Sequence, residues 1–193
     1  MKVISGFLRG REIKGYTIDG TRPTMDRVKE SMFAIIQDYI KDSVCLDLFA
    51  GTGNLGIEAI SNGAKKVYFN DKNPVAVKII KSNLEKFGVM DKADVIKKDY
   101  EDAIEYYRVN RIKFNIIFLD PPYDNHVITQ ILKLIYRKKL LRKGGIVICE
   151  YQNEDISTEY FTVERQRVYG YRKVSIYTCL LYTSPSPRDG LLS

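Results

Sequence analysis

Hydrophobic and polar positions change their spacing in a regular order along the chain. Short apolar runs of strand length alternate with segments whose apolar residues recur at the three- and four-residue spacing of an amphipathic helix. The pattern predicts strands at 44–49, 67–69, 94–96, 114–119 and 146–151, and helices at 54–62, 74–87, 100–107 and 127–137. Because strands that alternate with helices pair in parallel, we expect an α/β fold with a doubly wound, mostly parallel sheet.

The two ends of this alternating part follow other patterns. Two strands at 161–169 and 172–177, separated by Gly170, are expected to form an antiparallel hairpin that closes the sheet. With the five parallel strands they make a sheet of seven. Short strands at 2–5 and 12–14 predict a small basic β-hairpin at the N-terminus.

One further helix is expected before the alternating part. Its apolar positions run from Met25 to Ile40, and Thr24 has the side chain of an N-cap. Arg27 and Lys29 fall on the face predicted to point outward.

Composition adds limits on the class of protein. The 193 residues suit one catalytic domain, and the formal net charge of +7 is compatible with an anionic partner. Three widely spaced cysteines indicate neither a disulfide framework nor a zinc site, and no metal site is expected. No signal peptide and no membrane-length apolar run are visible, so we expect a cytoplasmic protein that does not bind a membrane.

A glycine-rich turn follows the strand at 44–49 and opens the next helix. It reads Gly51-Thr52-Gly53-Asn54-Leu55-Gly56, and glycines at these positions let the backbone approach a ligand closely. Asp71 comes twenty residues after Gly51, at the end of the second strand, where a carboxylate can accept hydrogen bonds from ribose hydroxyls. These features alone are compatible with a nucleotide or with S-adenosylmethionine.

The tetrad Asp120-Pro121-Pro122-Tyr123 follows the fourth strand and favours methyl transfer to an exocyclic amine. The lone pair of such an amine is delocalised into the base, so the site must accept its hydrogens to localise that pair. The Asp120 carboxylate and the Pro121 carbonyl can accept them, and Tyr123 can stack on the base. A simple stiffened loop would explain the tetrad alone, and a nicotinamide-dependent oxidoreductase has no use for it.

The residues 47–53, the tetrad and the segment 21–30 together resemble the RsmD family. They read Asp-Leu-Phe-Ala-Gly-Thr-Gly, Asp-Pro-Pro-Tyr and Thr-Arg-Pro-Thr-Met-Asp-Arg-Val-Lys-Glu. The resemblance covers about residues 2–177. It implies a class I S-adenosylmethionine-dependent methyltransferase of Rossmann-like fold that modifies the N2 amine of a guanine in 16S ribosomal RNA.

The resemblance also implies roles for individual residues. The methionine part of S-adenosylmethionine would contact Asp47, Phe49, Gly51 and Gly53. The ribose would contact Asp71, and the adenine would contact Asp99. The guanine would lie against Asp120, Pro121, Pro122 and Tyr123, and the RNA-binding candidates are Arg9, Arg11, Arg22 and Arg27. The family more often has Glu at the ribose position and Asp two residues later, where this chain has Asp71 and Asn73.

These expectations divide the chain and leave alternatives open. We expect a basic hairpin at 1–22, a methyltransferase domain at 23–178 and a non-native or disordered tail at 179–193. The expected partner is ribosomal RNA, within a small-subunit particle, bound by a monomer. A DNA adenine-N6 methyltransferase or another amino-methyltransferase would use the same tetrad, and a non-catalytic RNA-binding protein could share the fold.

Overall fold

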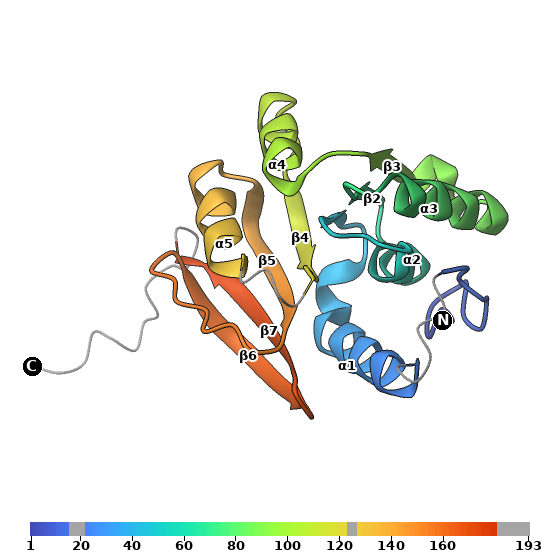
Figure 1. Cartoon of the computed structure of the whole chain (residues 1–193), viewed down its shortest axis with the longest axis horizontal. Coiled ribbons are helices and arrows are strands. Elements are labelled where there is room, and N and C mark those ends of the chain that lie inside the picture. The colour runs from blue at the N-terminus through green and yellow to red at the C-terminus, as the bar shows by residue number, and fades with distance from the viewer. Residues whose placement is uncertain (16–21, 123–126, 181–193) are drawn as a thin grey trace, which may run out of the picture.

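The computed structural model describes residues 1–15, 22–122 and 127–180, drawn from blue to red along the chain in Figure 1. Helices and strands alternate through most of this range, as the hydrophobic pattern predicts. The first elements are α1 (Arg22–Ile40), β1 (Val44–Asp47), α2 (Asn54–Ser61), β2 (Lys66–Asn70), α3 (Pro74–Phe87), η1 (Met90–Lys92) and β3 (Ala93–Ile96). The later ones are α4 (Tyr100–Val109), β4 (Phe114–Leu119), α5 (Ile128–Arg137), β5 (Leu141–Tyr151), β6 (Phe161–Tyr169) and β7 (Arg172–Cys179).

The strands form one seven-stranded sheet in the order β3-β2-β1-β4-β5-β7-β6. The first five strands along the chain pair in parallel, and β7 lies antiparallel between β5 and β6. The chain builds outward from β1 to β3 and then returns to place β4 on the other side of β1. This reversal between β1 and β4 is the topological switch point of the sheet. The predicted doubly wound sheet with an antiparallel edge hairpin is confirmed.

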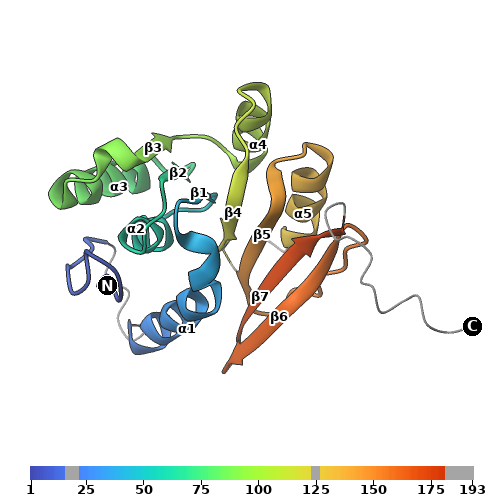
Figure 2. The same cartoon turned by 180° about the vertical axis from the view of Figure 1, so that it is seen from behind.

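Helices cover both faces of the sheet (Figures 1 and 2). Successive side chains of a strand point to opposite faces, so neighbouring residues of β4 belong to different cores. Ile116 and Phe118 pack in the core formed with α1, α2 and α3, whereas Ile117 and Leu119 pack in the core formed with α4 and α5. Parallel strands buried on both faces explain the continuous apolar runs of the sequence.

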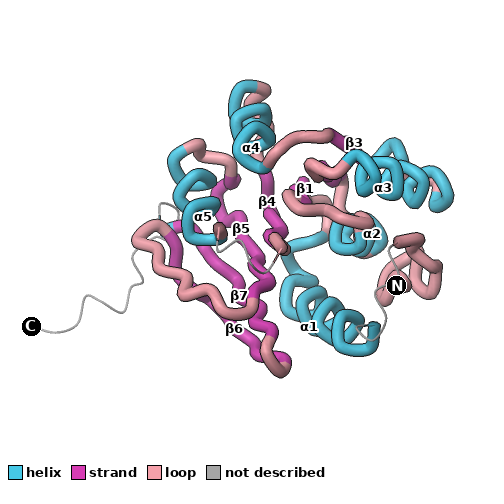
Figure 3. The backbone as a smooth tube through the Cα atoms, viewed as in Figure 1, coloured by secondary structure: helices cyan, strands magenta, loops and turns pink. Residues whose placement is uncertain are grey.

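The first fifteen residues lie beside α1 and α2 and form a loop throughout (Figure 3). The two strands expected here reduce to one antiparallel bridge between Lys2 and Glu12. Val3, Leu8 and Ile13 are buried in the same core as α1, α2 and α3. Backbone hydrogen bonds still join the two arms as in a hairpin, since Val3 N–H donates to the Arg11 carbonyl and Ile13 N–H to the Met1 carbonyl, each at 2.9 Å.

Other boundaries also differ from the prediction. Helix α1 begins at Arg22, which places Thr24 inside the helix instead of at its N-cap. Proline is tolerated in a first helical turn, where its missing N–H has no helical partner, and Pro23 is compatible with this earlier start. Strand β5 begins at Leu141, five residues before the expected strand, because it pairs with β4 across an irregularity. Of the expected tail, Cys179 ends β7, and residues 181–193 lie outside the described residues.

Candidate active site

One large cavity lies at the switch point, beyond the carboxyl ends of the parallel strands. Its volume is about 970 Å³. Ligands of doubly wound sheets bind at this position, so the cavity is the first candidate for a site. The predicted site residues that line it are Asp47, Phe49, Gly51, Asp71, Asp99, Asp120, Pro121 and Pro122. Tyr123 lies outside the described residues.

The glycine turn is held by the carboxylate of Asp71. Gly51 donates its backbone N–H to Asp71 Oδ2 at 2.9 Å, and Asn73 donates to Asp71 Oδ1 at 2.8 Å. Gly51 has a φ of 55°, and a Cβ built on it would meet open space. Gly53 has a φ of 82°, but its Cβ would approach Ile57 and Ile80 of the core. Gly51 therefore faces the cavity, and Gly53 shapes the turn from outside the lining.

Asp47 is a buried acid at the end of β1. Its Oδ2 accepts the backbone N–H of Gly56, on helix α2, at 3.0 Å. Burial raises the pKa of Asp47 to about 7, against the lowering effect of the Gly56 hydrogen bond, and the charge of Asp71 raises it further. The free site thus holds a carboxyl group that gains its charge near neutral pH.

Asp99 marks the far end of the cavity, where β3 leads into α4. It is the N-cap of α4, and its Oδ1 accepts the backbone N–H of Glu101 at 3.4 Å. Next to it, the rings of Phe49 and Tyr100 lie 5.8 Å apart between centroids, and both residues line the cavity. A carboxylate beside two aromatic rings can bind a planar group that carries an amine.

Asp120 follows β4 and lies in an acidic cluster. Burial, and then the charges of Glu150 and Asp47, raise its pKa well above the usual carboxyl range, while Arg172 opposes the shift. Arg172, at the start of β7, forms an ion pair with Glu150 of β5, and both side chains are buried. The site thus brings three acids and one guanidinium together at the ends of β1, β4, β5 and β7.

Several lining residues were not predicted from the sequence. They are Glu150 and Gln152 at the end of β5, and Tyr171 and Arg172 at the turn between β6 and β7. Glu150 could have been found, because it falls at the carboxyl end of a predicted parallel strand, as Asp120 does. The turn residues carry no such signal, since strand direction there depends on the hairpin.

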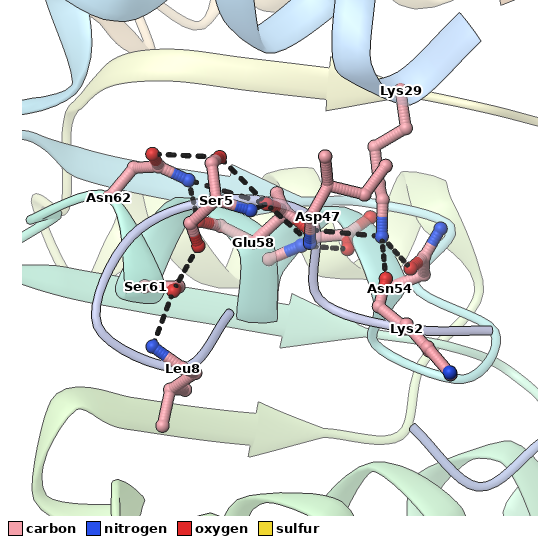
Figure 4. A network of polar contacts seen from close by, with 11 residues as sticks. Lys2, Ser5, Leu8, Lys29, Asp47, Asn54, Glu58, Ser61 and Asn62 are labelled. Atoms are coloured by element: carbon pink, nitrogen blue, oxygen red, sulfur yellow. Dashed lines mark hydrogen bonds and ion pairs between the residues drawn. The ribbon is translucent and has the colours of Figure 1, made fainter. Parts of the chain in front are cut away.

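The N-terminal segment forms another wall of the cavity. A buried network of polar contacts around Glu58 of α2 holds this segment in place (Figure 4). Glu58 accepts the backbone N–H groups of Ile4 and Ser5, and Lys29 Nζ lies 2.9 Å from its Oε2. Lys29 also donates to the Lys2 carbonyl and to Asn54 Oδ1, each at 2.7 Å. The expectation that Lys29 points outward is wrong, because Glu58 supplies a buried counter-charge.

Asn83 of α3 ties the same segment to the glycine turn. Its Nδ2 donates to the Lys14 carbonyl at 2.8 Å and to the Thr52 carbonyl at 3.1 Å, and its Oδ1 accepts the Lys14 N–H at 2.9 Å. The segment from Glu12 to Gly15 lines the cavity in consequence. Met1 and residues 12–15 are therefore part of the site.

Arg9, Arg11 and Arg27 lie outside the cavity lining. Arg9 and Arg27 are exposed. Arg11 Nη2 donates to the Lys86 carbonyl at 2.8 Å, and its guanidinium lies 4.7 Å from the ring centroid of Phe87. Arg11 thus contacts the C-terminal end of α3, where a cation is favourable. The side chain of Arg22 is not among those described.

The structure describes the ranges 1–15, 22–122 and 127–180. No helix within them is both long and apolar enough to cross a membrane. No group of three or more His, Cys, Asp or Glu side chains there is arranged to hold a metal ion.

The strand order and the switch-point cavity define the class I methyltransferase fold. A solved structure with this arrangement is the Escherichia coli protein titled "Putative methyltransferase yhhF". It superposes with a TM-score of 0.79 and 26% identity, over 93% of this chain and 97% of that one. The family described as "Conserved hypothetical protein 95" matches residues 1–178. The chain belongs to this family, which is the RsmD family that its motifs resemble.

Curated relatives match nearly the whole chain. A Bacillus subtilis protein named "Putative rRNA methyltransferase YlbH" is 38% identical, over 92% of this chain and 98% of its own length. The Haemophilus influenzae protein named "Ribosomal RNA small subunit methyltransferase D" is 32% identical, over 92% of this chain and 93% of its own length.

Proposed function

We propose that this protein is an S-adenosylmethionine-dependent methyltransferase that modifies the N2 amine of a guanine in small-subunit ribosomal RNA. The observation that carries the proposal is the single cavity shared by the Gly51 turn and Asp120-Pro121-Pro122. A methyl donor bound at the first and an amine bound at the second would lie side by side. Family membership and the printed names of the relatives support the ribosomal substrate.

The cavity has features that fit S-adenosylmethionine. Its volume of about 970 Å³ is in the range of cofactor sites. The open space at Gly51 leaves room for a ligand close to the backbone. Asn70 also lines the cavity, and its buried Oδ1 has no hydrogen-bond partner among the described residues. A ligand donor could satisfy this acceptor, which would otherwise be costly to bury.

Different acids along the cavity would bind different parts of the cofactor. We assign Asp71 to the ribose hydroxyls and Asp99 to the adenine amine. Asp47, Phe49 and Gly51 would hold the methionine part, with Gly53 shaping the turn. When bound, the cofactor supplies an electrophilic methyl group on a positively charged sulfur.

Asp120 and Pro121 would prepare the amine. Burial raises the pKa of Asp120, so this group would have to lose its own proton before its carboxylate accepts an amine hydrogen. The Pro121 carbonyl would accept the second hydrogen, and Tyr123 would stack on the guanine. Accepting both hydrogens localises the nitrogen lone pair and directs it at the methyl group. The proton that leaves the methylated amine can pass to water.

The same proposal covers partner and location. We propose that the enzyme acts as a monomer in the cytoplasm, on ribosomal RNA within a small-subunit particle. Arg9, Arg11, Arg22 and Arg27 would contact RNA phosphates around the cavity. For Arg11 this requires contact beyond its hydrogen bond to the end of α3.

A direct test is incubation of the protein with labelled S-adenosylmethionine and unmodified small-subunit particles, followed by mass mapping of the labelled nucleotide. We expect N2-methylguanosine at one position of the ribosomal RNA. Label on DNA alone, or on a different base, would contradict the proposed substrate.

Two single variants separate the roles of the acids. Asp120→Ala should bind S-adenosylhomocysteine as the wild type does and lose methyl transfer, because Asp120 acts on the amine. Asp71→Ala should lose both S-adenosylhomocysteine binding and methyl transfer, because Asp71 also holds the Gly51 turn. Calorimetric titration and single-turnover methyl transfer measure the two effects. Equal loss of cofactor binding in both variants would refute the assignment of Asp120.

A further inference from the structure

The turn between β6 and β7 lies at the mouth of the cavity. Its residues Tyr171 and Arg172 both line the cavity. Arg172 is buried, whereas Tyr171 is 62% exposed, although a tyrosine ring is a large apolar surface. The turn therefore presents an aromatic ring to solvent at the entrance of the proposed guanine site.

The hairpin holds this turn in a defined place. Gly170 adopts a φ of 60°, which allows the tight reversal, and Tyr169 pairs with Arg172 in the ladder. Strand β7 also pairs with β5 on its other edge, from Tyr151 and Lys173 onward. The backbone at Tyr171 is thus positioned relative to the end of β5 by two strand pairings.

The surroundings of the ring suit a nucleic acid. Deep residues of the cavity are acids, and its exposed lining residues carry both charges, with Lys14 and Lys72 as cations and Glu12 and Asp99 as anions. The Arg172 guanidinium lies 5.9 Å from the centroid of the Tyr171 ring. Exposed aromatic rings among cations are the usual elements of single-strand recognition, in which bases stack on the rings and cations contact phosphates.

We infer that Tyr171 stacks on an unpaired base of the substrate RNA that flanks the methylated guanine. The target would enter beside Asp120, and its neighbour would remain at the rim, on the exposed ring. This inference rests on the proposed function, because it needs an RNA whose target nucleotide is extruded into the cavity. It adds a substrate-positioning residue from a part of the chain that the motifs do not reach.

Three variants test the inference on the full-length protein. Tyr171→Ala removes the ring, Tyr171→Phe keeps it without the hydroxyl, and Tyr106→Ala removes another partly exposed tyrosine from α4, outside the cavity lining. The measurements are the Kd for unmodified small-subunit particles, the KM and kcat for methyl transfer, and the Kd for S-adenosylhomocysteine.

We expect Tyr171→Ala to raise the Kd and KM for particles about tenfold, the loss typical of one stacked base. Its kcat and its affinity for S-adenosylhomocysteine should stay within about twofold of the wild type. Tyr171→Phe and Tyr106→Ala should resemble the wild type, because stacking uses the face of the ring.

Unchanged particle affinity in Tyr171→Ala would overturn the inference, and so would an equal loss in Tyr171→Phe. An active wild type with either result refutes the stacking role and leaves the proposed function intact. Conversely, particle binding that depends on the Tyr171 ring, without any methyl transfer by the wild type, refutes the proposed reaction alone.

Discussion

Replacing Asp47 by asparagine should stabilise the protein at neutral pH and make its stability less dependent on pH. The Asp47 side chain is only 1% exposed, and burial raises its pKa from 3.8 to about 7. A folded-state pKa above the unfolded one means that the folded protein retains a proton which the unfolded chain has lost. This contribution to stability is complete below about pH 4 and is lost as pH rises through about 7.

The magnitude follows from the size of the shift. A rise of about three in the pKa of Asp47 corresponds to a free-energy difference of roughly 4 kcal/mol between its charged and neutral forms. Asparagine is never charged, and its Oδ1 can still accept the hydrogen bond from Gly56. The free energy of unfolding of Asp47→Asn should therefore exceed that of the wild type by an amount that grows by about 2–3 kcal/mol from pH 5 to pH 8.

Urea unfolding followed by far-ultraviolet circular dichroism measures this difference, and it suits a chain without tryptophan. The matched control is Asp38→Asn, which removes an exposed acid of α1. Its stability curve should run parallel to that of the wild type. The reasoning would be refuted if the gain in the free energy of unfolding of Asp47→Asn were independent of pH, or if the variant were less stable than the wild type at pH 8. If the cofactor assignment is right, the same variant should bind S-adenosylmethionine more weakly, because it cannot offer a charge to a cationic ligand.

Two other variants probe the walls of the cavity. Gly51→Ala should weaken binding of S-adenosylhomocysteine at least tenfold in calorimetric titration, because the new methyl group enters the cavity. Gly88→Ala is its control, since Gly88 shares the positive φ and the open surroundings but ends α3 outside the lining; equal losses would refute the close approach at Gly51. Glu58→Gln should lower the free energy of unfolding by about 3–5 kcal/mol, because Lys29 is left buried without its counter-charge. Glu105→Gln breaks two solvent-exposed pairs, with Arg108 and Lys138, and should shift the thermal midpoint far less, so similar midpoints for the two variants would show that the buried pair is dispensable.

The sequence by itself determined the order of the elements and the position of most of the site. Apolar runs of strand length separated by amphipathic segments require a parallel sheet, and the carboxyl ends of parallel strands meet at one edge. Asp71, Asp99 and Asp120 each follow such a strand, so their convergence on one cavity could be predicted, whereas Asp47 lies inside the predicted strand 44–49. The glycine turn added the place where backbone approaches a ligand.

The tertiary structure alone decided which distant segments complete the cavity. Lys29 has the pattern of an outward residue on an amphipathic helix, yet it is buried because Glu58 meets it from another helix. Arg172 and Tyr171 reach the site because β7 inserts between β5 and β6, an order that no local pattern encodes. Local periodicity specifies a strand or a helix, whereas a buried charge or a hairpin at a cavity depends on partners far away in the sequence. The contribution of Lys29, Tyr171 and Arg172 to the cavity lining is therefore evident only from the folded chain.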